Sequence, residues 1–101
     1  MKLVEIRLLK PAQTELDDGI IWYEGQVSGL GIEFLGEILE TFKRTKLNPD
    51  VWASFSKRTR RCLVHRFPYG IIYQIRENEI LVIAIAHLHR KPGYWKDRMN
   101  P

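Results

Sequence analysis

The sequence predicts one α+β domain in the order β-α-α-β-β-β, with an antiparallel helical hairpin packed on a curved, mainly antiparallel four-stranded sheet. Three observations support this fold class. An apolar–charged alternation opens the chain, two stretches with helical periodicity follow, and three β-rich runs fill most of the second half. The 101 residues have the length of one ordinary domain, and no internal repeat or Pro/Gly/Ser-rich linker divides them. We therefore expect residues 1–101 to form a single domain.

The first strand is predicted from the alternation near the N-terminus. Val4, Ile6 and Leu8 are apolar, whereas Glu5 and Arg7 between them are charged. Successive side chains of a strand point to opposite faces, so this pattern indicates one buried and one largely solvated face. The same stretch lacks the basic region and hydrophobic segment of a secretion signal.

The first helix is predicted from about Pro11 to Val27. Proline suits a first helical position because its missing N–H would have no partner there. Apolar residues then recur at spacings of four and three, at Ala12, Leu16, Ile20, Tyr23 and Val27. The acidic residues keep to other faces of this amphipathic helix, at Glu15, Asp17, Asp18 and Glu24.

The second helix is predicted after the breaker cluster at residues 28–31. Its apolar stripe consists of Phe34, Leu35, Ile38, Leu39 and Phe42. Asn48-Pro49 ends the helix, because asparagine tolerates the left-handed conformation of a helix stop and proline cannot extend the hydrogen-bond ladder. The two helices should form an antiparallel hairpin.

The second half is predicted to be a three-stranded meander. Residues 49–59 form a loop anchored by Trp52 and Phe55, and the strands follow at 61–67, 69–76 and 79–88, separated by Pro68 and by a turn at Glu77-Asn78. The last run is apolar at nearly every position, which is typical of a central strand that is buried on both faces. Pro92-Gly93 ends the sheet and leaves a short basic and aromatic tail at residues 94–99.

The composition favours a folded cytoplasmic protein. Hydrophobic residues make up 45% and charged residues 28%, as in soluble globular chains. The longest apolar run, Ile80 to Ala86, is much shorter than the ~20 residues of a spanning helix, so we expect no membrane span. Cys62 cannot form an internal disulfide, fits a reducing compartment and should be a small buried hydrophobe.

The charge of the chain is unevenly distributed. The net charge is +4, but residues 1–50 hold 6 Lys and Arg against 9 Asp and Glu, a net −3, whereas residues 51–101 hold 10 against 3, a net +7. A basic half attracts polyanions or an acidic protein segment, and charge alone does not distinguish the two.

A family resemblance rests on the second half. Arg61, the stretch Phe67-Pro68-Tyr69-Gly70-Ile71-Ile72-Tyr73-Gln74-Ile75 and the strand from Ile80 to His87 together resemble the strongest motif of RelE/ParE toxins. The closing run from His87 to Trp95 is similar to a tail common in the ParE-like branch, and the helix with Leu16 and Trp22-Tyr23 also fits. The resemblance covers nearly the whole chain.

This resemblance implies the toxin of a bacterial type II toxin-antitoxin system, bound in a hetero-oligomer by a cognate antitoxin whose C-terminal segment wraps around it. Two modes of growth inhibition occur in the superfamily: ribosome-dependent mRNA cleavage, and poisoning of DNA gyrase without a known hydrolytic site. A long hairpin, and an Arg-rich segment where nucleases have a Lys-rich one, favour gyrase as the target. An mRNA endoribonuclease and an inactive toxin-like binding module are the alternatives.

A nuclease of this type needs no metal, but it needs a base, an acid and cations that stabilise the charge developing on phosphate. If the chain is such an enzyme, the candidate catalytic residues are Arg61, His65, His87 and Tyr94. Strand alternation would place His87 and His89 on one face and His65 on an adjoining strand. The competing interpretation is that His87 closes the core with a hydrogen bond while the other histidines are solvated.

We expect neither a metal nor a cofactor. His87 and His89 have the spacing of a ligand pair, but no Cys, Asp or Glu stands nearby in the sequence to complete a site. The candidates for binding the target or the antitoxin are Arg58, Arg60, Arg66, Arg90, Lys91, Trp95, Lys96 and Arg98. These residues could follow a phosphate backbone, receive acidic antitoxin side chains, or form a solubilising surface.

Overall fold

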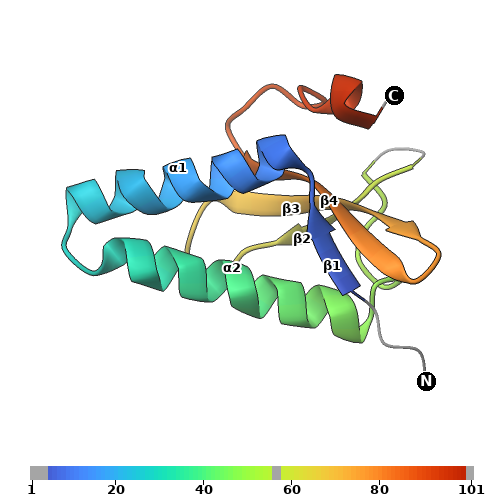
Figure 1. Cartoon of the computed structure of the whole chain (residues 1–101), viewed down its shortest axis with the longest axis horizontal. Helices are drawn as coiled ribbons and strands as arrows, with labels where there is room; N and C mark the ends of the chain where they lie inside the picture. The colour runs from blue at the N-terminus through green and yellow to red at the C-terminus, as the bar shows by residue number, and fades with distance from the viewer. Residues whose placement is uncertain (1–4, 56–57, 100–101) are drawn as a thin grey trace.

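The computed structural model describes residues 5–55 and 58–99. A strand leads into two antiparallel helices, and a three-stranded meander and a one-turn 3-10 helix follow (Figure 1). The elements are β1 (Glu5–Leu8), α1 (Lys10–Gln26), α2 (Leu30–Leu47), β2 (Arg60–Leu63), β3 (Tyr69–Arg76), β4 (Glu79–His87) and η1 (Lys96–Met99). The predicted α+β class and the order β-α-α-β-β-β are confirmed.

The four strands form one sheet in the order β1-β4-β3-β2. The β2–β3 and β3–β4 pairs are antiparallel, whereas β1 runs parallel to β4. A register shift between Ile72 and Tyr73 of β3 leaves Ile83 of β4 as an extra residue, and such a bulge increases the local bend of a sheet. β4 is an inner strand and is buried from Ile80 to Ala86, as its apolar run predicted.

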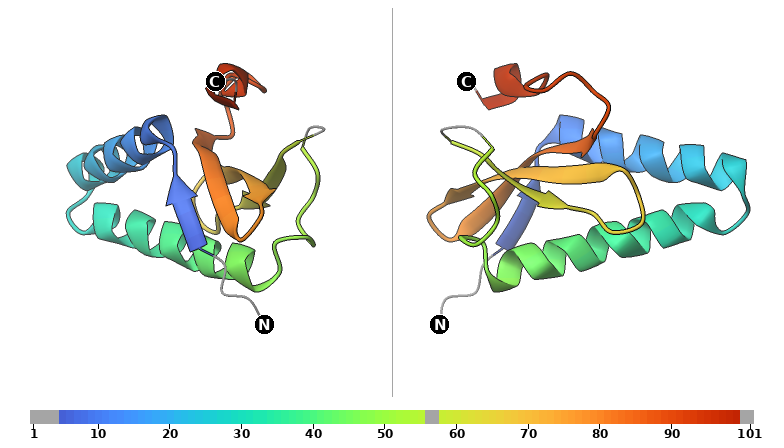
Figure 2. Two further views of the ribbon diagram at one scale, coloured as in Figure 1. Left: turned by 45° about the vertical axis from the view of Figure 1, so that its right-hand side comes forward. Right: turned by 180° about the vertical axis from the view of Figure 1, so that it is seen from behind.

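Each face of the inner strands has its own cover. The helical hairpin packs Ala12, Leu16, Phe34 and Ile38 against one face. On the other face, Trp95 of the tail packs with Phe55 of the loop and Met99 against the sheet. Figure 2 shows the hairpin on one side of the sheet and the loop after α2 on the other. Both faces of β3 and β4 are therefore buried, although the helical hairpin covers only one face.

The junction of the helices is organised by two glycines and one carboxylate. Gly29 has a φ of 89°, in the left-handed region that glycine adopts without strain. The Glu24 carboxylate accepts the N–H groups of Gly29, the N-cap of α2, and of Gly31 in its first turn, which has no partner within the helix. A Cβ at Gly31 would lie 2.6 Å from the carbonyl oxygen of Ile20, so the helices approach closely because Gly31 has none.

Two of the predicted strands end earlier than expected. β2 stops at Leu63, not at residue 67. The Val64 N–H still bonds the Tyr69 carbonyl, in register with the Leu63–Gly70 pair, but the Tyr69 N–H bonds the Phe67 carbonyl and Arg66 takes a φ of 70°, so the chain turns instead of extending the ladder. β4 stops at His87, where Arg90 N–H bonds the His87 carbonyl in a turn. No helix in the described part of the chain is long and apolar enough to cross a bilayer.

Candidate functional site

Three of the four candidate catalytic residues meet at one end of the sheet. Arg61 of β2, His87 of β4 and Tyr94 of the tail line a small cavity of about 50 Å³, together with Phe55 and Arg90. His65 does not join them. The placement of His65 on a strand was wrong, because β2 has already ended, and its side chain lies exposed in the bend that follows.

The Tyr94 hydroxyl is part of a buried polar cluster around Glu15. It donates to Glu15 Oε2 at 2.6 Å. Arg98 donates to both carboxylate oxygens, at 2.8 and 3.0 Å, and the Ile85 N–H donates to Oε1 at 3.0 Å. The side chains of Glu15 and Arg98 are only 15% and 19% exposed, so this pair is shielded from solvent. We call Glu15, Tyr94 and Arg98 the Glu15 cluster.

The Glu15 cluster shifts the acidity of its members. Burial, followed by the hydrogen bond to Glu15 and its charge, raises the pKa of Tyr94 well above that of a free phenol. The hydrogen bond to Glu15 also raises the pKa of Arg98. Tyr94 therefore holds its proton tightly and directs it at a carboxylate, which is the arrangement of a structural link between the tail and α1.

The role of Glu15 was missed from the sequence, which places it off the apolar face of the first helix. Its hydrogen-bond partners lie 70 to 83 residues further along the chain, so no local pattern reveals them. The sequence does give one sign that Glu15 is near the core, which is its spacing from buried residues of the same helix. Glu15 stands three residues after Ala12 and four before Gly19, which are both buried, so it lies at the edge of the buried face.

His87 is half-buried among rings. Its ring meets those of Tyr69 and His89 edge to face, with centroids 5.1 and 5.0 Å away. Its Nδ1 accepts the backbone N–H of His89, which requires a neutral imidazole with its proton on Nε2. Burial, and secondarily His89, lowers the pKa of His87. His87 and His89 do lie together as expected, but a turn brings them together, not a shared strand.

Arg61 lies flat across the sheet. Its guanidinium stacks over Phe55 with 4.5 Å to the ring centroid. A Cβ at Gly70 of β3 would lie 3.0 Å from the Arg61 Cγ and Cδ atoms, so a larger residue there would displace the Arg61 side chain. Arg61 thus offers a positive charge to the small cavity from a fixed position.

The predicted binding residues separate into two groups. Several make structural contacts: Arg60 donates to the carbonyls of Asp50 and Trp52, Arg66 pairs with Glu33 and Glu37 of α2, Arg98 belongs to the Glu15 cluster, and Trp95 is 3% exposed in the core. Trp95 therefore covers the sheet and does not offer a stacking surface. The second group, Arg58, Arg90, Lys91 and Lys96, has exposed side chains, and within it Arg90 also contacts Glu15 and Tyr94.

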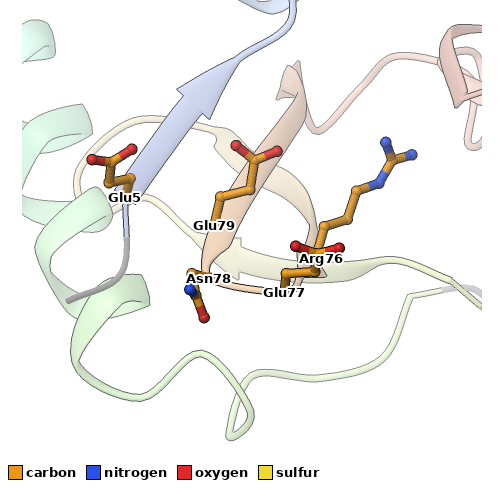
Figure 3. Close-up of a pocket in the computed structure, with 5 residues that line it drawn as sticks. All are labelled: Glu5, Arg76, Glu77, Asn78 and Glu79. Atoms are coloured by element: carbon orange, nitrogen blue, oxygen red, sulfur yellow. The ribbon is translucent and has the colours of Figure 1, made fainter. Parts of the chain in front are cut away.

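A larger surface cavity lies at the turn between β3 and β4, at the opposite end of β4 from His87. It is about 590 Å³ and is lined by Glu5, Arg76, Glu77, Asn78 and Glu79. Figure 3 shows Glu5 and Glu79 on neighbouring strands, and the Glu79 carboxylate is bound by Arg7 at 2.8 Å. Within residues 5–55 and 58–99, no group of three His, Cys, Asp or Glu side chains is placed to hold a metal ion.

Comparison with known proteins identifies the class. A family model described as "ParE toxin of type II toxin-antitoxin system, parDE" matches residues 6–92. A solved structure titled "Chromosomal ParDE TA system from P. aeruginosa" has a similar fold, with a TM-score of 0.72 and 17% identity over 86% of this chain and 98% of that chain. No curated protein sequence matches. The fold and the family match define a toxin of a type II toxin-antitoxin system. The chain belongs to the ParE toxin family, within the RelE/ParE superfamily that its motifs indicated.

Proposed function

We propose that this chain inhibits growth in the cytoplasm by binding and poisoning DNA gyrase, without hydrolysing a substrate, and that a cognate antitoxin neutralises it. The observation that carries this proposal is the Glu15 cluster. The hydroxyl that a nuclease would use as an acid donates instead to Glu15, and its pKa is raised. An acid that holds its proton this tightly contributes little to leaving-group protonation near neutral pH.

The outer surface of the hairpin supports a protein partner. Ile32 and Leu39 of α2 are 75% and 50% exposed and stand seven residues apart, which places them on the same side of the helix. Ile21 of α1 is 70% exposed. Apolar side chains of this size in water mark contact surfaces when they gather along one element.

A supercoiling assay with purified toxin and DNA gyrase tests the target. The proposal expects loss of supercoiling together with trapped complexes of gyrase and cleaved DNA. Unchanged supercoiling at a large molar excess of toxin would overturn gyrase as the target.

The antitoxin half of the proposal has a separate test. The gene beside this one should encode a small, partly acidic protein with a DNA-binding N-terminal domain. Its co-expression should restore growth, and the two proteins should purify together. Growth that stays inhibited in the presence of that protein would contradict neutralisation.

An mRNA endoribonuclease is the second candidate, because Arg61, His87 and Tyr94 line one cavity with Arg90. Under this alternative, primer extension on translated messages should reveal cuts in the ribosomal A site. His87→Ala and Arg61→Ala should each abolish these cuts in a folded protein. Intact messages during growth arrest would eliminate the alternative.

A further inference from the structure

Two adjoining cavities open beside the candidate site. The first, of about 450 Å³, is lined by Trp22, Tyr23, Pro68, Tyr69 and His87. The second, of about 270 Å³, shares Trp22, Tyr69 and His87 with the first and extends to Glu15, Asp18 and Arg90. The shared walls join them into one hollow between α1, the start of β3 and the end of β4, which we call the ring pocket.

Two walls of the ring pocket, Tyr23 and Tyr69, are packed against rings of the core. Tyr23 packs against Phe34 and Phe67 with centroids 5.0 and 4.9 Å away, and Tyr69 packs against Phe34 at 4.9 Å. Burial raises the pKa of Tyr69 to about 12, as expected for a phenol held in the core. Walls that are already ordered lose little conformational entropy on binding, so contacts made there contribute more to affinity.

Trp22 is the exposed wall. Its side chain is 59% exposed although it meets Tyr23 edge to face at 5.0 Å. Large aromatic side chains beside an apolar pocket are the residues that most often dominate the energy of a protein interface. The indole therefore has the position of an interface residue and contributes little to the core.

The mouth of the ring pocket is positive on the side of the tail. Arg90 is 54% exposed, lies 3.9 Å above the Tyr94 ring and is 3.9 Å from Glu15 Oε2. Because Arg98 already pairs with Glu15 at 2.8 Å, the Arg90 charge is only weakly compensated. Lys91 is exposed next to it, and Asp18 on the α1 wall is the opposing carboxylate.

We propose that the ring pocket receives one large apolar or aromatic side chain of the antitoxin, and that acidic residues beside this side chain pair with Arg90 and Lys91. The inference rests on the proposed function, in which an antitoxin neutralises the toxin. Aromatic and apolar walls select an apolar side chain, and the cations at the mouth select carboxylates beside it. Asp18 on the wall disfavours a phosphate backbone as the occupant, so a protein segment fits better than a nucleic acid.

The test titrates the purified product of the neighbouring gene into the full-length toxin by calorimetry. Trp22→Ala should raise Kd at least tenfold, and Trp22→Phe should retain most of the affinity because a ring still forms the wall. Arg90→Glu should weaken binding and flatten its dependence on salt. The matched control is Val51→Ala, which truncates an apolar side chain that is 67% exposed in the turn after α2, and it should bind like wild type.

Tryptophan fluorescence provides a second measurement. Trp22 is exposed, Trp52 is half-buried and Trp95 is 3% exposed, so covering Trp22 should shift the emission of the wild type to shorter wavelength. The same titration with Trp22→Phe should lack this shift. Circular dichroism melting of each variant establishes that it is folded.

The outcomes separate the inference from the function on which it rests. If the wild-type toxin does not bind the neighbouring protein, the proposed antitoxin partnership fails and the inference fails with it. If the wild type binds and Trp22→Ala binds equally well, only the inference is overturned. If Trp22→Ala keeps its antitoxin affinity but no longer inhibits growth, the pocket serves the target, and the antitoxin as occupant is rejected.

Discussion

Single residues explain how the tail is attached to the rest of the molecule. Glu15 on α1 receives hydrogen bonds from the end of β4 and from the tail, so one carboxylate joins three segments. Removing one partner of a shielded ion pair leaves the other charge without compensation, and this is costly in a poorly solvated place. The Glu15 cluster should therefore be a main determinant of stability.

Glu15→Gln tests this role. The amide keeps the shape of the side chain but loses its charge, so the variant should lose about 1–3 kcal/mol of unfolding free energy. Urea denaturation measures the loss. Asp17→Asn is the matched control, because Asp17 accepts its hydrogen bond from Gln13 at an exposed position of the same helix and the variant should stay within about 0.5 kcal/mol of wild type. Equal losses in the two variants would contradict the special role of Glu15.

His87 should make stability dependent on pH. Its pKa is lowered from the ordinary 6.5, so the folded state resists a proton that the unfolded state accepts. The contribution of His87 is therefore complete above about pH 6.5 and is lost as the pH falls toward the folded pKa.

Unfolding free energies measured at pH 7.5 and pH 5.5 test whether stability falls as the pH is lowered. The wild type should lose more stability between these two values than His87→Gln does, because the variant has no group to protonate there. His65→Gln serves as the control, since His65 lies exposed in a bend. A His87→Gln variant with the full acid sensitivity of the wild type would refute the assignment.

At the scale of elements, the helical hairpin depends on how closely its two helices approach. Gly31, the second residue of α2, lies against the backbone of α1, whereas a Cβ at Gly36, further along the same helix, would have no heavy atom within 4 Å. Because both glycines are in α2, their intrinsic cost to the helix is similar. The difference in stability between alanine at position 31 and alanine at position 36 therefore measures the effect of the contact between the helices.

Alanine at these two positions should act in opposite directions. Gly31→Ala places its Cβ 2.6 Å from the Ile20 carbonyl oxygen, so the helices must separate, and we expect a loss of about 1–3 kcal/mol. Gly36→Ala meets open space and should gain about 0.5–1 kcal/mol from better helix propensity. Thermal and urea unfolding of both variants measure the difference. A stable Gly31→Ala would mean that the close approach is not needed.

At the scale of the whole molecule, a four-stranded sheet with one helical hairpin has a second face to cover. The loop after α2 and the tail supply that cover through Phe55 and Trp95, whose ring centroids are 5.3 Å apart. Trp95 of the tail is thus part of the core of the domain, and Met99 packs against it. Any partner that moved the tail would also uncover the apolar face of β3 and β4.

The two tryptophans Trp22 and Trp95 should behave differently although they are chemically identical. Trp95→Ala removes a ring that is 3% exposed and should cost about 3–5 kcal/mol of unfolding free energy. Trp22→Ala removes a ring that is 59% exposed and should change stability by less than about 1 kcal/mol. Chemical denaturation of both variants measures the contrast. Similar losses would show that Trp22 is a core residue and would remove the physical basis of the ring pocket as an interface.

The sequence alone determined the class and order of the elements. Local signals were sufficient for this: Pro11 near the start of α1, the glycines between the helices, Asn48-Pro49 after α2, and the uninterrupted apolar run of β4. These signals act between residues that are near neighbours in the chain, through hydrogen-bond geometry and the period of apolar side chains. Arg61, His87 and Tyr94 were candidates because of their side-chain chemistry and the family resemblance, and the structure shows that these three line one cavity.

Only the tertiary structure decided which residues and strands far apart in the chain contact one another. Glu15 has the same local surroundings as the solvated carboxylates of its helix, Trp95 has the basic neighbours of a surface residue, and β1 shows no sign that it pairs in parallel with β4. Each of these facts depends on segments far apart in the chain being packed against one another. Periodicity reports which face of an element is apolar, but the partner of a buried charge or ring is set by how the finished layers meet.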